Sequence, residues 1–372
     1  MKKVKPSDGI TPWKLDSAIE RFLGAKADKS YFWKKLYVKL YKVFDKEYYK
    51  KGMKFIEKNI TLFRGTVSKK EKKKLIIDMV YSLHRFGCGF DEYFLYNFPT
   101  LDTEGRESFV TDKIRWDYYH KFNTNEGNAI FNDKKRTYDL FGKYFGRKVI
   151  TLETNQDKEK FLDFVSTVKQ FVVKPINSSG GRGVYKIKIN GTINLDKTFE
   201  DIIVNGAVVL EEVIQQSKKM SSLHPQSVNT LRVPTIRDKF GVHLFHPLLR
   251  VGVGESITDN ATSGGIFALI DENTGIVCSE ARDEKDHCFE VHPDTSVKFK
   301  GFQIPNWEQL VKLAEEVAMV VKDNHYVGWD FAHTDNGWVI VEGNPRGQII
   351  MMQLFFERGF KQELLTYADN LI

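Results

Sequence analysis

The sequence lacks the features that mark several large classes of protein. It has 3 cysteines among 372 residues, and so small and odd a number argues against a disulfide framework. No run approaches the roughly 20 uninterrupted apolar residues of a membrane span, and the N-terminus has no apolar middle segment of a secretory signal. We therefore expect a globular protein of the cytoplasm, with a core that 41% hydrophobic residues can build.

The common nucleotide and zinc motifs are also missing. No GxxxxGK[ST] loop occurs in the chain, and no GxGxxG lies between a strand and a helix. Cys278, His287, Cys288 and His292 lie close together in the sequence, but their spacing fits no usual zinc finger. We expect these thiols to be buried or incidental rather than metal ligands.

Positive charge is concentrated at one end of the chain. Residues 1–75 hold 22 Lys and Arg against 8 Asp and Glu, a net charge of +14, so the remainder carries −7 of the total of +7. Within this part, aromatic and aliphatic residues recur at helical spacing between lysines over 31–58. Such a basic amphipathic helix can lie on an anionic membrane or face a polyanionic partner, and it can also be a solvated face of a packed helix. No nucleic-acid-binding motif accompanies the charge, so we expect no nucleic-acid partner.

The pattern of secondary structure changes near residue 130. Before it the chain is mostly helical, for example over 68–86, where Ser68 is a candidate N-cap and Gly87 ends the helix. After it come short β-branched and aromatic runs separated by Gly, Asn and Asp, with a helix predicted over 306–324 behind Asn306. Grouped strands of this kind indicate an α+β architecture with mainly antiparallel sheets.

Two apolar runs near the C-terminus, "VGWDFAH" and "WVIVEGN", flank "TDNG", which predicts a β-hairpin. A three-residue loop ending in a left-handed Gly337 pairs Thr334 with Trp338, so that Phe331 meets Val341. In this register Asp330 lies opposite Glu342 and one face of the hairpin is apolar. A two-residue loop would shift the register by one and put the two acids on different faces. We expect the first register.

Opposed carboxylates on a sheet repel each other unless a positive charge lies between them. Asp330 and Glu342, with Asn344 two residues further on, offer the oxygen ligands that suit Mg²⁺. The alternative is a pair of acids at the solvated end of a hairpin. The metal would also account for Asn344 and Arg346, which the alternative leaves unexplained, but the residues of this hairpin alone leave both interpretations open.

A second cluster, "FVVKPINSSGGRGVYKI" (171–187), consists of a strand, a Ser/Gly-rich loop and another strand. Small residues let backbone N–H groups converge on phosphate oxygens, and Lys174 would add a positive charge. An ordinary glycine-rich hairpin has the same pattern. A third apolar strand, "AVVLEEVI" (207–214), could offer backbone groups to an adenine edge and a carboxylate to a ribose.

These elements, in this order, resemble the ATP-grasp superfamily over about residues 130–350. The resemblance implies a small lobe with the glycine-rich flap at 131–213 and a large lobe with the metal site at 214–372. The helical, basic region at 1–130 departs from the α/β segment that precedes the fold in many such ligases. ATP and Mg²⁺ are the implied cofactors.

By the same resemblance, each motif receives a role. In "NDKKRT", Lys134 is similar to the first lysine that contacts the phosphates, and Lys174 to the second. Arg346, in "EGNPRGQ", would meet the substrate carboxylate or the charge that develops in phosphoryl transfer. The flap, the adenine hinge and the magnesium ligands are assigned in turn to Ser178, Ser179, Gly180, Gly181, Arg182 and Gly183; to Glu211, Glu212, Val213 and Ile214; and to Asp330, Glu342 and Asn344.

Within the superfamily, "HPQSVNTLRVPTI" and "RVGVGESITDNATSGGIFALID" are most similar to the sugar-transfer-associated branch, found beside bacterial surface-polysaccharide synthesis. Arg250 then resembles a further phosphate-binding residue, and Asn260, Gly264 and Gly265 would shape the substrate side. D-alanine ligases place an arginine where this chain has Gly328, so we expect Arg250 or Arg232 to take its role.

The resemblance implies an ATP-dependent carboxylate–amine ligase that acts through an acyl phosphate. Its substrates would be a small carboxylate and an amine, one of them part of an anionic glycan precursor. The basic helices would suit peripheral association with the inner face of the membrane or with glycosyltransferases. Two alternatives stay open, namely a phosphotransferase without ligation and a non-catalytic nucleotide-binding partner of a glycosyltransferase.

Overall fold

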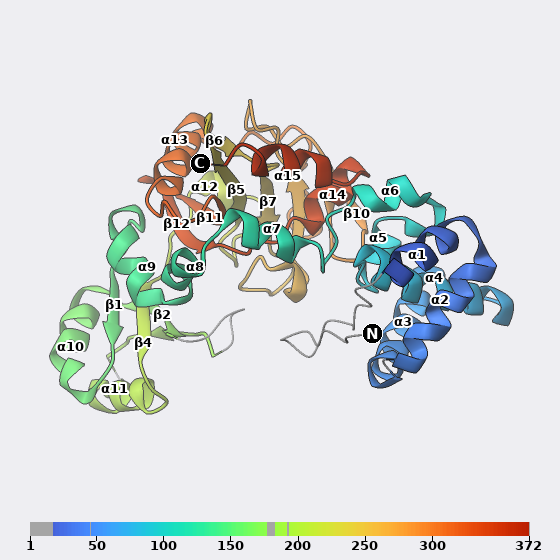
Figure 1. Cartoon of the computed structure of the whole chain (residues 1–372). Helices are drawn as coiled ribbons and strands as arrows, with labels where there is room; N and C mark the ends of the chain where they lie inside the picture. The colour runs from blue at the N-terminus through green and yellow to red at the C-terminus, as the bar shows by residue number, and fades with distance from the viewer. Residues whose placement is uncertain (1–17, 45, 177–182, 192, 372) are drawn as a thin grey trace. The chain divides into compact units, whose positions relative to one another are not determined.

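The structure is a computed structural model that describes residues 18–44, 46–176, 183–191 and 193–371 (Figure 1). The chain forms two compact units. A helical unit contains the residues up to His120 together with Ile349–Asp369, and a second unit contains Lys121–Gln348 with the residues from Asn370 on. The C-terminal helices thus belong with the N-terminal ones, whereas we had predicted them in the large lobe.

The helical unit is built from consecutive helices (blue to cyan in Figure 1) and from two that close the chain. Its elements are α1 (Ala18–Lys29), α2 (Tyr31–Phe44), α3 (Lys46–Arg64), α4 (Lys69–Phe86), α5 (Glu92–Leu95), α6 (Thr103–Ser108), α14 (Ile350–Phe356) and α15 (Lys361–Ala368). The helix α7 (Arg115–Phe122) runs across the boundary between the units. Within the described residues, every helix is too short or too polar to span a lipid bilayer.

Local sequence signals place the helix ends as predicted in this unit. The Ser68 hydroxyl accepts a hydrogen bond from the Glu71 N–H at 3.2 Å and caps α4. Gly87 ends α4 with a left-handed φ of 65°. The amphipathic stretch predicted over 31–58 is divided between two helices, α2 and α3.

A buried glutamine joins the C-terminal helices to the rest of the helical unit. The Gln353 amide nitrogen donates to the Tyr96 hydroxyl and to the Val110 carbonyl, each at 3.0 Å. Its amide oxygen accepts from the Val110 and Phe360 N–H groups at 2.9 and 3.1 Å. All polar atoms of this fully buried amide therefore have partners, as a polar group in a core requires.

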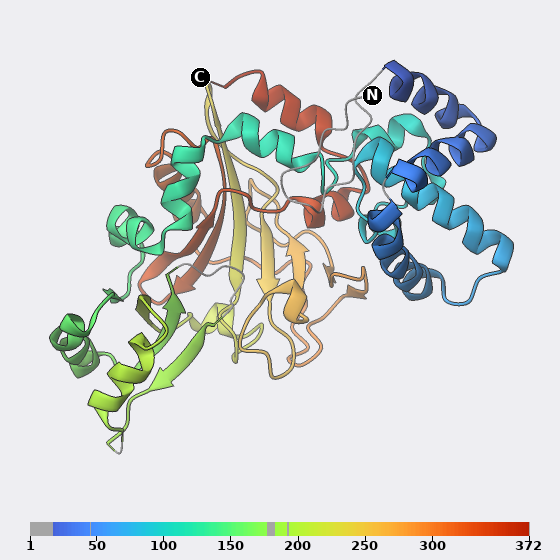
Figure 2. The ribbon, with the colours of Figure 1, turned by 60° about the horizontal axis from the view of Figure 1, so that its bottom comes forward.

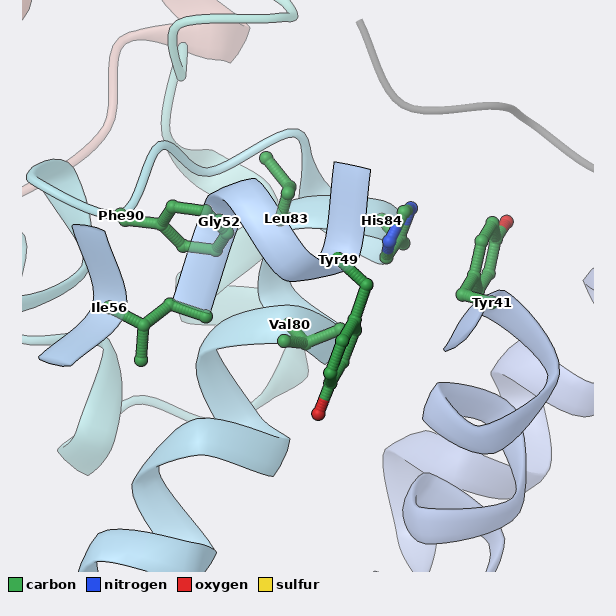
Figure 3. A pocket seen from close by; sticks show the side chains of 8 residues that line it. All are labelled: Tyr41, Tyr49, Gly52, Ile56, Val80, Leu83, His84 and Phe90. Atoms are coloured by element: carbon green, nitrogen blue, oxygen red, sulfur yellow. The ribbon is translucent and has the colours of Figure 1, made fainter. Parts of the chain in front are cut away.

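A small cavity of about 10 Å³ lies between α3 and α4, and Figure 3 shows the side chains that line it. Tyr41 stacks on the ring of His84 with centroids 3.7 Å apart, and burial lowers the pKa of His84 to about 3. Gly52 lets the Phe90 ring approach, because a Cβ at this position would lie 3.0 Å from it. A space of this size holds a single water molecule at most, so it is a packing feature rather than a substrate site.

The second unit begins with a small lobe around a four-stranded sheet of order β1-β4-β2-β3. Helices α10 and α11 supply Phe161, Phe164 and Phe199 to its core, and Figure 1 shows these helices beside the sheet. Its elements are α8 (Asn125–Asn132), α9 (Lys134–Phe141), β1 (Val149–Leu152), α10 (Lys158–Thr167), β2 (Gln170–Pro175), β3 (Tyr185–Lys188), α11 (Leu195–Ile203) and β4 (Val208–Glu212).

The large lobe carries an eight-stranded sheet of order β10-β9-β8-β7-β5-β11-β12, with β6 paired to β5 (Figure 2). Every strand pair in both sheets is antiparallel, which confirms the predicted architecture. Its elements are α12 (Lys218–Ser221), β5 (Thr230–Asp238), β6 (Gly241–Leu244), β7 (Leu248–Val251), β8 (Ile266–Leu269), β9 (Ala281–Arg282), β10 (Cys288–Phe289), α13 (Trp307–Ala318), β11 (Tyr326–Thr334) and β12 (Gly337–Asn344).

The prediction for α13 was only partly right. The helix ends at Ala318 rather than at 324. Asn306 precedes it, but its side chain makes no capping hydrogen bond. Instead its amide nitrogen lies 3.2 Å from Nε2 of His333 on β11. The asparagine therefore joins the helix start to the sheet.

The β11–β12 hairpin pairs Asp330 with Glu342 as predicted, but its loop differs from the prediction. Its loop has two residues, because Thr334 pairs with Gly337, and Phe331 consequently pairs with Ile340. Both pairings differ from the prediction. A register shift between Asp330 and Phe331 leaves one extra residue, and beyond it Asp330 pairs with Glu342 as predicted.

Candidate functional site

The buried acid of the predicted metal site, Asp330, is held by two arginines from neighbouring strands. Arg232 on β5 donates from Nε to Oδ1 at 2.6 Å and from its terminal nitrogen to Oδ2 at 3.0 Å. Arg250 on β7 donates to the same Oδ2 at 3.0 Å. Burial alone would raise the pKa of Asp330, but the charges of Arg232 and Arg250 outweigh it and lower the pKa. The carboxylate is therefore ionised and neutralised by its neighbours.

The opposing acid, Glu342, is in a different environment. Its side chain reaches solvent, and its Oε1 accepts a hydrogen bond from the Asn344 amide at 3.0 Å. The surrounding protein removes part of its hydration, and this burial, together with the charge of Asp330, raises the pKa of Glu342. Repulsion between the two carboxylates therefore remains at Glu342.

These contacts decide how Mg²⁺ would fit. At Asp330 a cation is not needed to offset the negative charge, because Arg232 and Arg250 already supply positive charge there. Asp330 accepts three hydrogen bonds, which leaves one of its four lone-pair positions on Oδ1. Glu342 is exposed, carries the unrelieved repulsion and lies beside the Asn344 amide. The donor set thus fits a hard cation held mainly by Glu342 and Asn344, with one remaining position on Asp330.

A second buried carboxylate organises the small lobe. Glu211 on β4 binds Arg147 through two hydrogen bonds, of 2.6 and 3.1 Å, to one oxygen. Lys174 on β2 and the Tyr138 hydroxyl bind its other oxygen. Burial would raise the pKa of Glu211, but Lys174 and Arg147 lower it to about 2. The predicted phosphate lysine, Lys174, is thus ion-paired to a residue that we had predicted at the adenine hinge.

The first predicted lysine, Lys134 at the start of α9, binds the backbone at the end of β2. Its ammonium donates to the Pro175 carbonyl at 2.9 Å and to the Ile176 carbonyl at 3.2 Å. Burial and then the charge of Lys174 lower the pKa of Lys134, while Glu342 and Glu211 act in the opposite direction. Lys174 of the small lobe and Glu342 of the large lobe therefore lie near enough to Lys134 for their charges to act on it.

The hinge residues are only partly arranged as predicted. The Glu212 N–H donates to the Lys148 carbonyl at 2.9 Å, and the Val213 N–H donates to the Gln170 carbonyl at 3.2 Å. Both amides thus hold the sheet together instead of facing a ligand. Ile214 follows them and is half-buried.

Most of the predicted flap, Ser178 to Arg182, lies outside the described residues. Gly183 directly follows it, with a φ of 71°. A side chain would be strained at this φ, and its Cβ would lie 3.1 Å from the Pro175 ring. The conformation explains why glycine is needed where the segment returns to β3.

The predicted substrate residues cluster around Arg250. The Asn260 side-chain oxygen binds the Arg250 guanidinium, and the Asn260 carbonyl accepts from the Gly265 N–H at 3.0 Å. Gly264 has a φ of 87°, and a Cβ on Gly265 would lie 2.3 Å from the Asp259 carbonyl oxygen. The two glycines therefore allow the tight turn that brings Asn260 to Arg250.

Gly328 is the position at which the resemblance to D-alanine ligases implies an arginine. A Cβ here would lie 3.2 Å from Cα of Gly347 and 3.5 Å from Cδ of Arg232. The Arg232 side chain, from the neighbouring strand, therefore passes over this position. Of the two arginines that we expected to compensate, Arg232 is the one that lies here.

Arg346 lies in an exposed position on the turn after β12. Asn123 stabilises this turn, because its amide donates to the Pro345 carbonyl at 2.7 Å. The Tyr326 hydroxyl donates to the Gly347 carbonyl at 2.7 Å. Both neighbours of Arg346 are therefore anchored, and the arginine follows Asn344 on a supported segment of chain.

Sequence reasoning missed three polar residues of the site. Arg147 also donates to the Ile340 carbonyl on β12 at 2.7 Å, and so connects Glu211 of the small lobe to the large sheet. Tyr138 is the second, and Asp259, which lies 3.4 Å from Arg250, is the third. The signal for Arg147 was its position just before β1, in "FGRKVI", but a single basic residue before a strand predicts no partner.

The pattern of the sugar-transfer associated ATP-grasp family matches residues 113–368. The chain belongs to this family. The predicted ATP-grasp fold is thereby confirmed, and no curated protein matches the chain.

Three solved structures illustrate the likeness. For D-alanyl-alanine synthetase A from Vibrio cholerae the TM-score is 0.44 at 14% identity, with 67% of each chain covered. For D-alanine–D-alanine ligase from Helicobacter pylori it is 0.42 at 17% identity, with 68% of this chain and 64% of that chain covered. For the ATP-grasp ligase PsnB, complexed with a phosphomimetic variant of its minimal precursor, Mg and ADP, it is 0.41 at 14% identity, covering 67% and 61%.

Proposed function

We propose that the protein is an ATP-dependent ligase that joins a carboxylate to an amine through an acyl phosphate. The observation that carries the proposal is the shared charged neighbourhood of Lys134, Lys174 and Glu342. Two ammonium groups from the small lobe and an exposed carboxylate from β12 are what a nucleotide triphosphate with a divalent ion requires. Family membership supports ATP as the substrate that they hold.

Each residue has a role that its position allows. Lys134 and Lys174 would neutralise phosphate oxygens, and Lys174 would exchange its bond with Glu211 for one of them. Glu342, Asn344 and Asp330 would hold Mg²⁺, which neutralises charge on the transferred phosphoryl group. Arg346 and Arg250 would orient the substrate carboxylate and stabilise charge in the transition state. No side-chain nucleophile is required, because positioning and charge neutralisation account for the chemistry.

The finer part of the proposal concerns the substrates. We assign as acceptor a precursor of a cell-surface polysaccharide, with an amino acid joined by an amide to a uronic acid or an amino sugar. The support is the sugar-transfer association of the family. We place the reaction in the cytoplasm, where ATP is available.

The test is product analysis with purified protein, ATP and Mg²⁺, using amino acids in combination with uronic acids and amino sugars. Ligation yields ADP, phosphate and an amide. A stable phosphorylated sugar would instead support a phosphotransferase, and ATP binding without turnover for every pair would support a non-catalytic partner of a glycosyltransferase. Glu342→Gln is the matched control, because it removes one charge at an exposed side chain.

A further inference from the structure

Three consecutive helices of the helical unit expose large apolar side chains. Phe22 on α1 is 58% exposed, Phe32 on α2 is 68% exposed and Phe55 on α3 is 62% exposed. Of the phenylalanines that the structure describes, the other one with comparable exposure is Phe240. Tyr31, Val43 and Leu62 on the same helices are exposed as well. This concentration within about 40 residues exceeds the scattered apolar exposure of an ordinary surface.

The apolar side chains alternate with lysines along each outward face. On α2, Phe32, Lys35, Lys39 and Val43 follow the spacing i, i+3, i+7, i+11 and are all exposed. This spacing keeps them on one side of the helix. The opposite side of α2 is packed inward through Tyr37, Val38 and Tyr41. The outward face is therefore not the one that holds the unit together.

The next helix repeats the arrangement. On α3, Lys51, Phe55, Lys58 and Leu62 follow the spacing i, i+4, i+7, i+11 and are exposed, while Ile56 and Ile60 are buried. On α1, the Lys26 ammonium lies 5.6 Å from the centre of the exposed Phe22 ring. Each helix thus presents the same combination of ring or aliphatic tip and ammonium group.

The charge of these helices selects a polyanionic partner. Residues 18–64 contain 13 Lys and Arg against 5 Asp and Glu, a net charge of +8. One of the acids, Glu57, is bound to Lys72 at 2.8 Å. A nucleic acid would leave Val43 and Leu62 without apolar contacts. A bilayer of anionic lipid meets both requirements, because its headgroups attract lysine while its acyl boundary accepts apolar side chains.

We propose that the exposed faces of α1, α2 and α3 bind the surface of an anionic lipid bilayer. Phe22, Phe32, Phe55 and Leu62 enter the boundary between headgroups and acyl chains, and the lysines between them stay among the headgroups. The proposal stands independently of the ligase activity, since it uses no residue of the second unit. Its consequence would be that the enzyme works beside substrates carried on a membrane.

The test uses flotation of the full chain with vesicles of phosphatidylcholine alone or mixed with phosphatidylglycerol. We expect binding to the mixed vesicles, little binding to the neutral ones, and weakening with added salt. Phe32→Ala with Phe55→Ala should lower the partition coefficient by about tenfold or more, as should Lys35→Glu with Lys39→Glu. Both variants alter exposed side chains, so circular dichroism should show an unchanged fold.

Matched controls lie in the second unit. Phe240→Ala removes a ring that is 72% exposed and lies beside Lys239. Lys285→Glu with Lys300→Glu changes the net charge by the same amount at exposed positions. Neither control should change vesicle binding. The proposal is overturned if the wild-type protein does not float with anionic vesicles, if the controls weaken binding as much as the test variants, or if the phenylalanine variant binds like the wild type.

Discussion

Asp330 and Glu342 face each other across β11 and β12 because Val341, an extra residue in β12, compensates for a short turn. With the two-residue turn alone, the pairing that joins Phe331 to Ile340 would continue by placing Asp330 opposite Val341. The bulge turns Glu342 to the face of Asp330 instead. An irregularity of one residue thus creates the acid pair on which the proposed metal site depends.

Replacing each of the two acids by its neutral amide should change the free energy of unfolding by different amounts. Asp330→Asn removes the charge that Arg232 and Arg250 bind, so the free energy of unfolding should fall by about 3 kcal/mol. Glu342→Gln relieves repulsion and retains an oxygen for the Asn344 amide, so the free energy of unfolding should stay within about 0.5 kcal/mol or rise slightly. Urea unfolding of both variants measures the contrast, and equal destabilisation would contradict it.

The same pair also separates stability from activity. If Glu342 holds Mg²⁺, Glu342→Gln should reduce turnover by about a hundredfold or more despite its unchanged stability. An unreduced rate would remove Glu342 from the metal site. For Asp330→Asn, loss of turnover is informative only at temperatures where circular dichroism shows the variant folded.

Arg147 should be among the most sensitive positions of the small lobe. Arg147→Ala removes two bonds to Glu211 and one to the Ile340 carbonyl, all at buried groups, so the free energy of unfolding should fall by about 3 to 5 kcal/mol. Arg147→Lys should recover only part of the lost stability, because one ammonium cannot make all three bonds to the Glu211 oxygen and the Ile340 carbonyl that the guanidinium makes. The control is Arg136→Ala, an exposed arginine on α9, which should shift the midpoint of thermal unfolding little. Similar effects of the two alanine variants would argue against the role of Arg147 in joining Glu211 to the Ile340 carbonyl.

Glu211 should make stability depend on acid pH. Its pKa is about 2 in the folded protein, below the ordinary 4.5. The stabilisation is thus fully present above pH 4.5 and is lost as the pH falls toward 2. Compared with Glu211→Gln, the wild type should be more stable by about 3 kcal/mol near pH 7, and this difference should shrink on acidification. A difference in unfolding free energy that does not change with pH would contradict the ion pairs.

Two adjacent glycines provide a matched test of the turn that carries Asn260. Gly264→Ala meets no neighbouring atom and adds only the strain of a positive φ, about 1 to 2 kcal/mol. Gly265→Ala places a Cβ 2.3 Å from the Asp259 carbonyl oxygen, which the backbone must move to avoid. We expect Gly265→Ala to destabilise the protein more and to weaken substrate binding, measured as an increased KM. The reverse order of the two variants would show that the turn is not arranged as described.

Features that depend on residues close together in the chain were easier to predict than features that depend on distant residues. Signals within a few residues were sufficient, as with the Ser68 cap and the positive φ of Gly87. The Asp330–Glu342 pairing was also predicted, although the assumed loop was wrong and the bulge corrected the error. A bulge leaves no clear trace in a pattern of alternating residues, because the extra position can hold any residue of suitable size.

The residues that neutralise Asp330 could not be found in this way. Arg232 and Arg250 lie 98 and 80 positions before it in the chain and meet it only because β5 lies between β7 and β11 in the sheet. Strand order is decided by the packing of the whole lobe, and no local pattern encodes it. The ion pairs of Glu211 with Arg147 and Lys174 depend in the same way on β4 lying between β1 and β2.

The hydrogen bonds of Gln353 have a consequence for how the protein can be divided. They fasten the last helices to Tyr96 and Val110, so the helical unit is completed by residues that follow β12 in the chain. The second unit is therefore inserted into the helical unit rather than appended to it, and the family match over residues 113–368 continues across α14 and α15. A shortened gene that begins at residue 121 would encode α14 and α15 without the core they need. To isolate the second unit, the helices that precede it and the helices α14 and α15 must be removed together.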